Sequence, residues 1–267
     1  SISPVQYNPI TKELIVYNEI DISIEFDGGN KHFGDDRLRS PYWDPIYECN
    51  ILNYNQLPSI DYGKRMQSWI KNRDEGTEYI ILIPNNEEFR PYAENLANFR
   101  RKQGIMTEVY TLAEAGVNSS EKLQSWIQDI YNNWEIPPVA ICLFGDNGGD
   151  LNLEIPAMTI PHSLDGTCIS DNPYADVNQD YLPDICLSRI VASNIEEAER
   201  LITKQLDYEY NSPCMDEYYY NKPVAACGWS MSAWFQFCSE SVVGYLRTIG
   251  RDPVRINGIY DYYSPDT

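Results

Sequence analysis

A short run of oxygen-bearing side chains is the strongest chemical signal in the sequence. Asp176, Asn178 and Asp180 alternate along one segment, and Asp184 follows four residues later. Ca²⁺ takes about 6–8 oxygen ligands, and a short loop of aspartates and asparagines can supply several of them. Tyr181 stands where such loops usually have glycine. We expect these four residues to bind Ca²⁺; the alternative is a solvated acidic turn that precedes a strand.

A second acidic segment follows a buried apolar run. Residues 145–150 read Gly-Asp-Asn-Gly-Gly-Asp and come directly after the apolar run 139–144. Ligands of open α/β sheets gather beyond the carboxyl ends of strands, so Asp146 could hold a second cation or line a cleft. Neither a Gly-Lys-Ser/Thr ending nor a helix start follows, which excludes a phosphate loop. A turn that uses glycine and asparagine for backbone freedom explains the segment equally well.

The residues needed for nucleophilic catalysis are present without a recognisable arrangement. The histidines are His32 and His162, and no Gly-x-Ser-x-Gly segment occurs. The residue types would allow a thiolate–imidazole dyad between His162 and one of three cysteines, Cys168, Cys186 or Cys227. Nothing in the local sequence supports it, because Cys142, Cys186 and Cys227 lie inside apolar runs typical of core strands. We therefore expect no complete catalytic dyad within these 267 residues.

Composition narrows the class of protein. Apolar residues make up 43% of the chain, enough to fill a core, whereas 40 acidic and 20 basic residues give a net charge of −20. Such a field repels phosphate backbones and attracts divalent cations, so nucleic acid is not expected as a partner. No apolar run approaches the about 20 residues that cross a bilayer. Seven cysteines without a Cys-x-x-Cys pair exclude a zinc ribbon and a fully paired disulfide framework, while a single disulfide stays open.

Strand and helix patterns alternate after residue 76, and they must position these side chains. Connections too long for hairpins indicate right-handed crossovers and a mostly parallel sheet covered on both faces. We expect residues 146–183 to form loops. Asn118 with Glu121 predicts the start of one helix, and Asn194 with Glu197 the start of another. The predicted strands cover 79–83, 105–110, 139–144, 184–191, 224–228 and 254–260, and the other predicted helices cover 88–103 and 233–249.

The first 73 residues have a different pattern. Apolar and polar residues alternate up to Phe26, which predicts a strand from Glu13 to Phe26. Residues 31–62 show no period and are expected to form an irregular wrap. Basic residues follow in a polar segment that we expect to be exposed: Lys64, Arg65 and Arg73. We place the domain boundary there, with residues 1–73 preceding a domain over 74–267 that divides into subdomains of about 74–150 and 151–267.

Taken in order, these segments resemble the gingipain-type cysteine peptidases. Residues 3–9, 14–17 and 20–22 look like the end of their propeptide. The opening of their catalytic domain is similar to residues 79–83, 101–104 and 107–109. The match continues through residues 144–146, 170–174, 176–184 and 187–190. Asp171 lies within it and joins Asp146 as a candidate for a second cation site or a cleft.

The resemblance implies a three-layer α/β/α caspase-like domain, preceded by a short β-rich remnant of a prosegment. It further implies a calcium-stabilised zymogen at the surface of a bacterium or secreted from it, which hydrolyses protein or peptide substrates with a Cys/His dyad on strand ends. No histidine follows His162, so the dyad is expected beyond Thr267, in the remaining part of the same enzyme. Lys64, Arg65 and Arg73 become candidate processing sites, the alternative being an ordinary exposed basic turn.

Two other functions stay open. A non-catalytic relative could keep the fold and the metal loop and act in secretion or surface binding. A carbohydrate-binding protein is suggested by the 21 tyrosines, although packing explains them more simply. Arg-specific members of the resembled family carry an acid at the start of the helix after residues 224–228, where this chain has Ala-Trp-Phe-Gln at 233–236. The resemblance therefore does not extend to a preference for arginine.

Overall fold

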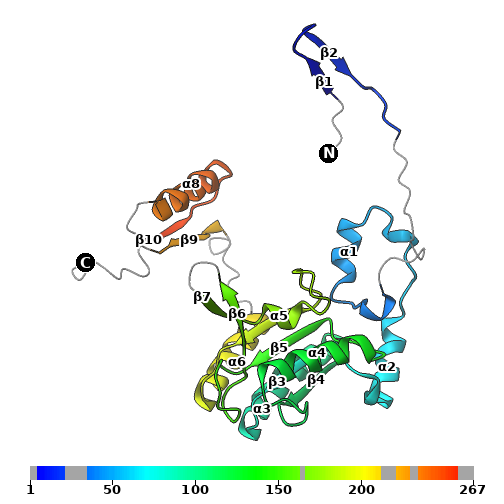
Figure 1. The fold of residues 1–267 in the computed structure, drawn as a ribbon, viewed down its shortest axis with the longest axis vertical. Coiled ribbons are helices and arrows are strands. Elements are labelled where there is room, and N and C mark those ends of the chain that lie inside the picture. The colour runs from blue at the N-terminus through cyan, green and yellow to red at the C-terminus, as the bar shows by residue number, and fades with distance from the viewer. Residues whose placement is uncertain (1–4, 22–34, 163–165, 212–220, 229–233, 258–267) are drawn as a thin grey trace, which may run out of the picture.

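Four parallel strands form the central sheet of the molecule (Figure 1). The computed structural model describes residues 5–21, 35–162, 166–211, 221–228 and 234–257. The strands are arranged in the order β4-β3-β5-β8, so each neighbour along the chain is reached by a crossover. Their bounds are β3 Tyr79–Ile83, β4 Thr107–Thr111, β5 Ala140–Phe144 and β8 Cys186–Ile190, which confirms the four strands predicted in this part of the chain.

The two central strands of this sheet are buried on both faces. Ile80–Ile83 of β3 and Ile141, Leu143 and Phe144 of β5 have no exposed surface. Continuous apolar, β-branched runs of this kind are typical of parallel strands that helices cover from both sides. The apolar runs in the sequence therefore fix the centre of the domain.

Helices cover the sheet on its two faces. Helices α3 (Arg90–Lys102) and α6 (Ile195–Tyr210) pack on one face, where Leu96 and Ile202 contact the core around Ile81. Helices α4 (Ser120–Asn133) and α5 (Asn172–Ala175) pack on the other, around Leu82. A short 3-10 helix, η4 (Glu87–Phe89), leads into α3. The result is the three-layer arrangement that the alternating pattern predicted.

The helix starts were predicted with mixed success. The Asn194 side chain accepts a hydrogen bond of 2.9 Å from the Glu197 N–H, as its spacing predicted. The predicted cap at Asn118 is wrong, because the neighbouring Ser119 accepts from the Lys122 N–H at 3.3 Å. Serine and asparagine both cap well, so sequence alone could not choose between adjacent candidates.

Residues 146–183 are not only loops, contrary to the prediction. They contain an antiparallel hairpin of β6 (Met158–His162) and β7 (Gly166–Ser170), and also helix α5. Asp, Asn and Pro are dense in this stretch and concealed the hairpin, whose side chains are mostly exposed. A strand pair without a buried face has no strong apolar alternation to reveal it.

The last described part of the chain repeats the strand–helix–strand pattern. Strands β9 (Val224–Cys227) and β10 (Val254–Asn257) pair in parallel, and α8 (Trp234–Thr248) connects them and contacts β9. Residue 233 of the predicted helix and residues 258–260 of the predicted last strand lie outside the described residues. The predicted subdomain division near residue 150 stays a prediction; β8, which comes after it, pairs with β5, which comes before it.

The N-terminal region contains more helix than its sequence suggested. Strands β1 (Val5–Asn8) and β2 (Glu13–Val16) form an antiparallel hairpin, so the predicted strand beginning at Glu13 ends at Val16 and not at Phe26; residues 22–34 lie outside the described residues. The predicted irregular wrap over 31–62 includes a helix, α1 (Asp44–Asn50), with Pro45 in its first turn. The remaining elements are η1 (Asp36–Leu38), η2 (Tyr54–Gln56), α2 (Tyr62–Lys71) and η3 (Arg73–Glu75).

Candidate functional site

The predicted cation loop, residues 176–184, folds around its own carboxylates. The two carboxylate oxygens of Asp176 accept hydrogen bonds from the N–H groups of Asp180 (3.1 Å) and Tyr181 (3.0 Å). Asp184 Oδ2 accepts from the N–H groups of Val177 (2.9 Å) and Asn178 (3.2 Å). The loop is therefore a tight coil in which side-chain oxygens replace missing backbone hydrogen bonds.

Tyr181 adopts the backbone conformation expected of the glycine it replaces. Its φ is +71°, and Gln179 also has a positive φ of +63°. A bulky residue in the left-handed region is an outlier that costs about 1 kcal/mol or more, so the surrounding contacts must impose it. The loop thus makes the sharp turn of an Asp/Asn cation loop without glycine.

The side-chain oxygens of this loop are ligands that suit a hard cation, but its acidic side chains do not form a cluster. Asp176 is only 8% exposed, and no arginine or lysine pairs with it among the described residues. A buried carboxylate without a cationic partner is costly and favours a bound cation. Within those same residues, no three His, Cys, Asp or Glu side chains are grouped closely enough to hold a metal. Binding would require amide and carbonyl oxygens besides the carboxylates, which Ca²⁺ accepts.

Arg189 contacts both residues that were predicted to hold a second cation or line a cleft, Asp146 and Asp171. Arg189 of β8 donates to both carboxylate oxygens of Asp171 at 2.7 Å. Its third nitrogen donates to the carbonyl oxygens of Gly145 (3.1 Å), Asp146 (3.2 Å) and Ile155 (2.9 Å). Arg189 thus joins the end of β5, the following loop and the segment before α5.

Sequence reasoning missed this arginine. Its side chain is 10% exposed and that of Asp171 is 25% exposed, so the pair is largely removed from water. The available signal was an arginine within a predicted strand that also contains Leu187 and Ile190, since an arginine in a largely buried strand needs an acidic partner. The bidentate contact leaves the Asp171 oxygens occupied, and a second cation at Asp146 and Asp171 stays a prediction.

Asp146 has a separate role at the end of β5. Its carboxylate accepts from the Ser193 hydroxyl and from the Asn147 N–H, each at 2.7 Å. These two hydrogen bonds hold the pKa of Asp146 below its usual value. The carboxylate therefore stays ionised and orders the loop between β8 and α6 against the end of β5.

His162 and the candidate cysteines are distributed over three sheets of the described chain. In the hairpin, His162 pairs with Gly166 and Cys168 with Ile160, so imidazole and thiol are not opposite each other. Cys186 lies in another sheet, on β8. Burial raises the pKa of the Cys142 thiol to about 11, which keeps it protonated. His32 lies outside the described residues.

The candidate processing residues Lys64 and Arg65 lie in a helix. They occupy the first turn of α2, where Asp61 accepts from the Lys64 N–H at 2.9 Å. The Arg65 guanidinium donates to the carbonyl oxygens of Arg37 and Arg39, each at 2.8 Å. The prediction of an exposed polar segment is confirmed for Lys64 and Arg73, whereas Arg65 is half-buried and Trp69 of the same helix is 1% exposed. Proteases cut exposed, extended chain, so cleavage at Arg65 requires this turn to open.

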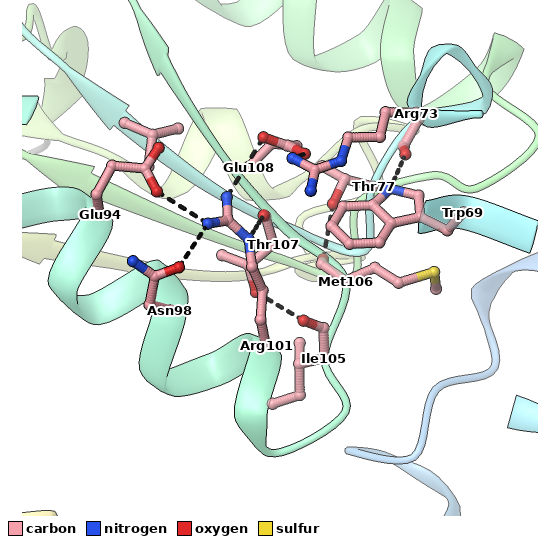
Figure 2. Close-up of polar contacts among 12 residues, drawn as sticks. Trp69, Arg73, Thr77, Glu94, Asn98, Arg101, Ile105, Met106, Thr107 and Glu108 are labelled. Carbon is pink, nitrogen blue, oxygen red and sulfur yellow. Dashed lines mark hydrogen bonds and ion pairs between the residues drawn. The ribbon is translucent and has the colours of Figure 1, made fainter. Parts of the chain in front are cut away.

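Arg73 is engaged by neighbouring side chains from the domain that follows it. Figure 2 shows Arg73 and Arg101 both reaching Glu108, at 2.6 Å and 3.4 Å. The Arg73 guanidinium also lies 4.7 Å from the centre of the Trp69 ring, and the indole N–H donates to the Gly76 carbonyl at 2.9 Å. The side chain of Arg73 is nevertheless 51% exposed. It is the more accessible of the two arginine candidates.

These features place strand-end acids, the acidic loop over residues 176–184 and a basic connecting segment on a fold that has known relatives. Residues 72–239, more than half of the chain, match peptidase family C25. The chain belongs to this family. Residues 1–57 match the propeptide of family C25. The resemblance to gingipain-type cysteine peptidases is thereby confirmed, and the chain is a C25 peptidase region preceded by propeptide sequence.

The curated relatives of this C25 chain are bacterial gingipains. Lys-gingipain of Porphyromonas gingivalis is 23% identical over 92% of the chain, which spans 13% of that protein. Gingipain R2 of the same species is 21% identical over 81% of the chain, which spans 27% of that protein. The chain therefore corresponds to a minor part of the length of these relatives.

Solved structures confirm the fold. The crystal structure of the Arg-specific cysteine proteinase gingipain R aligns with a TM-score of 0.53 and 16% identity, covering 68% of this chain and 41% of that one. The complex of the Porphyromonas gingivalis RgpB pro- and mature domains aligns with a TM-score of 0.51 and 18% identity, covering 67% and 41%. The predicted α/β caspase-like fold is confirmed. None of the helices in the described residues has the length and apolar character needed to span a bilayer.

Proposed function

We propose that this chain is the front portion of a secreted, gingipain-like cysteine endopeptidase that is made as a zymogen. In the complete enzyme, a cysteine and a histidine encoded beyond Thr267 would hydrolyse peptide bonds of protein or peptide substrates. The observation that carries the proposal is the order of the two family matches, propeptide over 1–57 and peptidase over 72–239. A propeptide directly before a peptidase is the arrangement of a precursor activated by cleavage.

In this proposal the described residues position the reaction without performing it. The thiolate would attack the peptide carbonyl, and the imidazole would transfer the proton to the leaving amine. The carboxyl ends of β5 and β8, held by Arg189 and Asp146, would line part of the cleft. The segment between the two matches, residues 58–71, contains Lys64 and Arg65 and would be cut during activation, with Arg73 as the alternative position.

The proposal is tested on the full-length protein with fluorogenic peptides that differ in the residue before the scissile bond. We expect hydrolysis that iodoacetamide abolishes. Single Cys→Ala variants at the seven cysteines of this chain should retain it, because the nucleophile lies downstream. Loss of activity in one of these variants, with its folding intact, would contradict the downstream dyad. A full-length protein that is cleaved and folded but hydrolyses no peptide would instead favour a non-catalytic secretion or surface-binding module.

We also propose that the loop over residues 176–184 binds calcium. Support comes from the buried Asp176 carboxylate, which has no cationic partner in the described chain, and from the glycine-like backbone of Tyr181. Ligands that bind only the folded state stabilise it by mass action. Calcium at 100-fold above its Kd should therefore raise the Tm by about 5–10 °C relative to protein in EGTA.

Asp180→Ala is the variant that localises the calcium effect. It removes one of the oxygen-bearing side chains, and its Tm should be the same with calcium and with EGTA. Asp150→Ala is a matched control, because Asp150 also accepts a local N–H, from Asn152, but lies in another loop. A calcium-induced Tm shift that survives in Asp180→Ala, or that is absent from the unmodified protein, would exclude this loop as the site.

A further inference from the structure

A buried glutamate lies at the contact between the propeptide region and the peptidase region. Glu78 immediately precedes β3 and is 1% exposed. Its Oε1 accepts a hydrogen bond of 2.9 Å from the Met106 N–H, whereas its Oε2 has neither a hydrogen-bond partner nor exposed surface. An ionised carboxylate in such a place costs several kcal/mol unless a charge or donors compensate it.

The residues that cover the Glu78 carboxyl belong to the propeptide region. We call residues 35–57 the strap; they lie within the propeptide match and end before the predicted processing site. Ser40 of the strap has no exposed surface, and its hydroxyl lowers the pKa of Glu78. Ser40, Tyr42 and Glu78 line one cavity of about 340 Å³. Lifting the strap would therefore uncover the glutamate.

Arg37 joins the strap to the peptidase region. The Arg37 guanidinium donates to the Trp134 carbonyl at 2.8 Å, at the end of α4. The Arg39 guanidinium donates to the carboxylate of Asp44 in α1. The Arg65 guanidinium of α2 donates to the backbone carbonyl of Arg39 in the strap. A change in the state of Glu78 can therefore shift the balance between the seated and the lifted strap.

No cationic side chain among the described residues forms an ion pair with Glu78. Arg65 is the cation whose field lowers its pKa, but that guanidinium donates to backbone carbonyls of the strap. Arg100 of α3 lines the same cavity and is paired with Glu209 of α6 at 2.6 Å. The remaining titratable groups around the cavity are Tyr42, Tyr79, Cys142, Cys186 and Arg189, of which Arg189 is paired with Asp171. Asp36 of the strap lines a different cavity with Arg65.

We propose that Glu78 makes the attachment of the strap to the peptidase region dependent on pH, with the strap seated when the carboxyl is protonated and loosened when it is ionised. This inference builds on the proposed zymogen, since it concerns how the propeptide region is retained. It does not depend on catalysis, because the strap and Glu78 both lie within this chain.

The direction follows from burial. Burial raises the pKa of Glu78 from 4.5 to about 7, and water would return it to its ordinary value once the strap lifts. Below pH 4.5 the carboxyl is protonated in both states and has no effect. As the pH rises from 4.5 through 7, the lifted strap gains from ionisation and the seated strap does not, and the full difference is reached above pH 7. Because the carboxyl ionises more readily when the strap is lifted, the equilibrium constant for seating the strap falls about tenfold from pH 6 to pH 8.

Hydrogen exchange read by mass spectrometry measures this weakening on the whole chain. Protection factors, corrected for intrinsic exchange at each pH, are compared for peptides within the strap and within α4. We expect strap protection to fall about tenfold between pH 6 and pH 8 while α4 protection stays constant. Strap protection that does not change relative to α4 would overturn the proposal without recourse to any variant.

Glu78→Gln separates this carboxyl from every other titrating group. The amide keeps the shape and cannot ionise, so strap protection should become independent of pH. Glu88→Gln removes an exposed carboxylate in η4, away from the strap, and should behave as the unmodified chain does. A fall of the same size in Glu78→Gln would assign the effect to another group. Loss of peptide hydrolysis in the full-length protein would refute the proposed function and leave these protection factors unaffected.

Discussion

The strand–helix–strand pattern occurs in two regions of the described chain with different results. In the central sheet, β3 and β5 are fully buried between two helical layers. In the unit formed by β9, α8 and β10, apolar side chains stay at the surface: Val224 is 61% exposed, Trp234 64% and Phe237 62%. The difference shows that a parallel pair with one helix does not by itself close a core, because one helix covers one face only.

The largest expected difference between the two regions concerns their strand residues. Leu82→Ala in β3 removes a side chain without exposed surface and should lower the free energy of unfolding by about 3–4 kcal/mol. Val224→Ala in β9 should cost less than about 1 kcal/mol, since that side chain is already mostly in water. Urea denaturation measures both changes. Comparable losses of unfolding free energy in the two variants would mean that β9 is as well covered as β3, which would contradict the contrast between the two regions.

The outer edge of the central sheet tests whether polar contacts add to its stability. Arg189→Met in β8 keeps the apolar stem and removes all contacts with Asp171 and three carbonyl oxygens. Breaking a largely buried pair leaves an uncompensated carboxylate, so we expect a loss of about 2–4 kcal/mol by the same urea measurement. Asp171→Asn with Arg189→Met should recover part of this loss, and a double variant no better than the single one would contradict the pairing.

A smaller effect is expected where α3 and α6 meet. Arg100 donates to both Glu209 oxygens, at 2.6 and 2.7 Å, and holds the pKa of Glu209 below its ordinary 4.5. The stabilisation is therefore present above pH 4.5 and lost as the pH falls through the lowered pKa. Glu209→Gln should cost about 1 kcal/mol at pH 7 and less at pH 3. Thermal unfolding at both values measures it; an equal cost at pH 3 would exclude the ion pair as the cause.

The smallest expected change has the opposite sign. Tyr181→Gly relieves a positive φ and should stabilise the chain by about 0.5–1 kcal/mol, because the tyrosine side chain is 90% exposed and loses little packing. Calorimetry in EGTA measures the change. Leu182→Gly is the matched control, since Leu182 is not among the residues with a positive φ, and it should destabilise. Equal destabilisation by both would show that the left-handed turn carries no strain.

The sequence predicted the elements that have a clear apolar pattern and missed those that lack one. β3 was predicted at its observed bounds because its apolar run is longer than any exposed strand would carry. The β6–β7 hairpin was missed because its exposed strands lack that pattern. Glu78 also escaped notice, although an acid directly beside a buried strand is a signal that the sequence contains. Ser40 of the strap, whose hydroxyl lowers the pKa of Glu78, is 38 residues away, and no local pattern connects the two.

Local pattern by itself determined the class of this protein, the parallel strands and the order of its segments. These depend on how each residue type partitions between water and the interior, which is a property of the residue and its neighbours along the chain. Only the tertiary structure decided which charges meet: Arg189 pairs with Asp171 and Arg100 with Glu209, whereas Oε2 of Glu78 has no hydrogen-bond partner within the described residues. Electrostatic partners are chosen by distance in space, and the crossovers of the sheet bring together residues that the sequence keeps far apart.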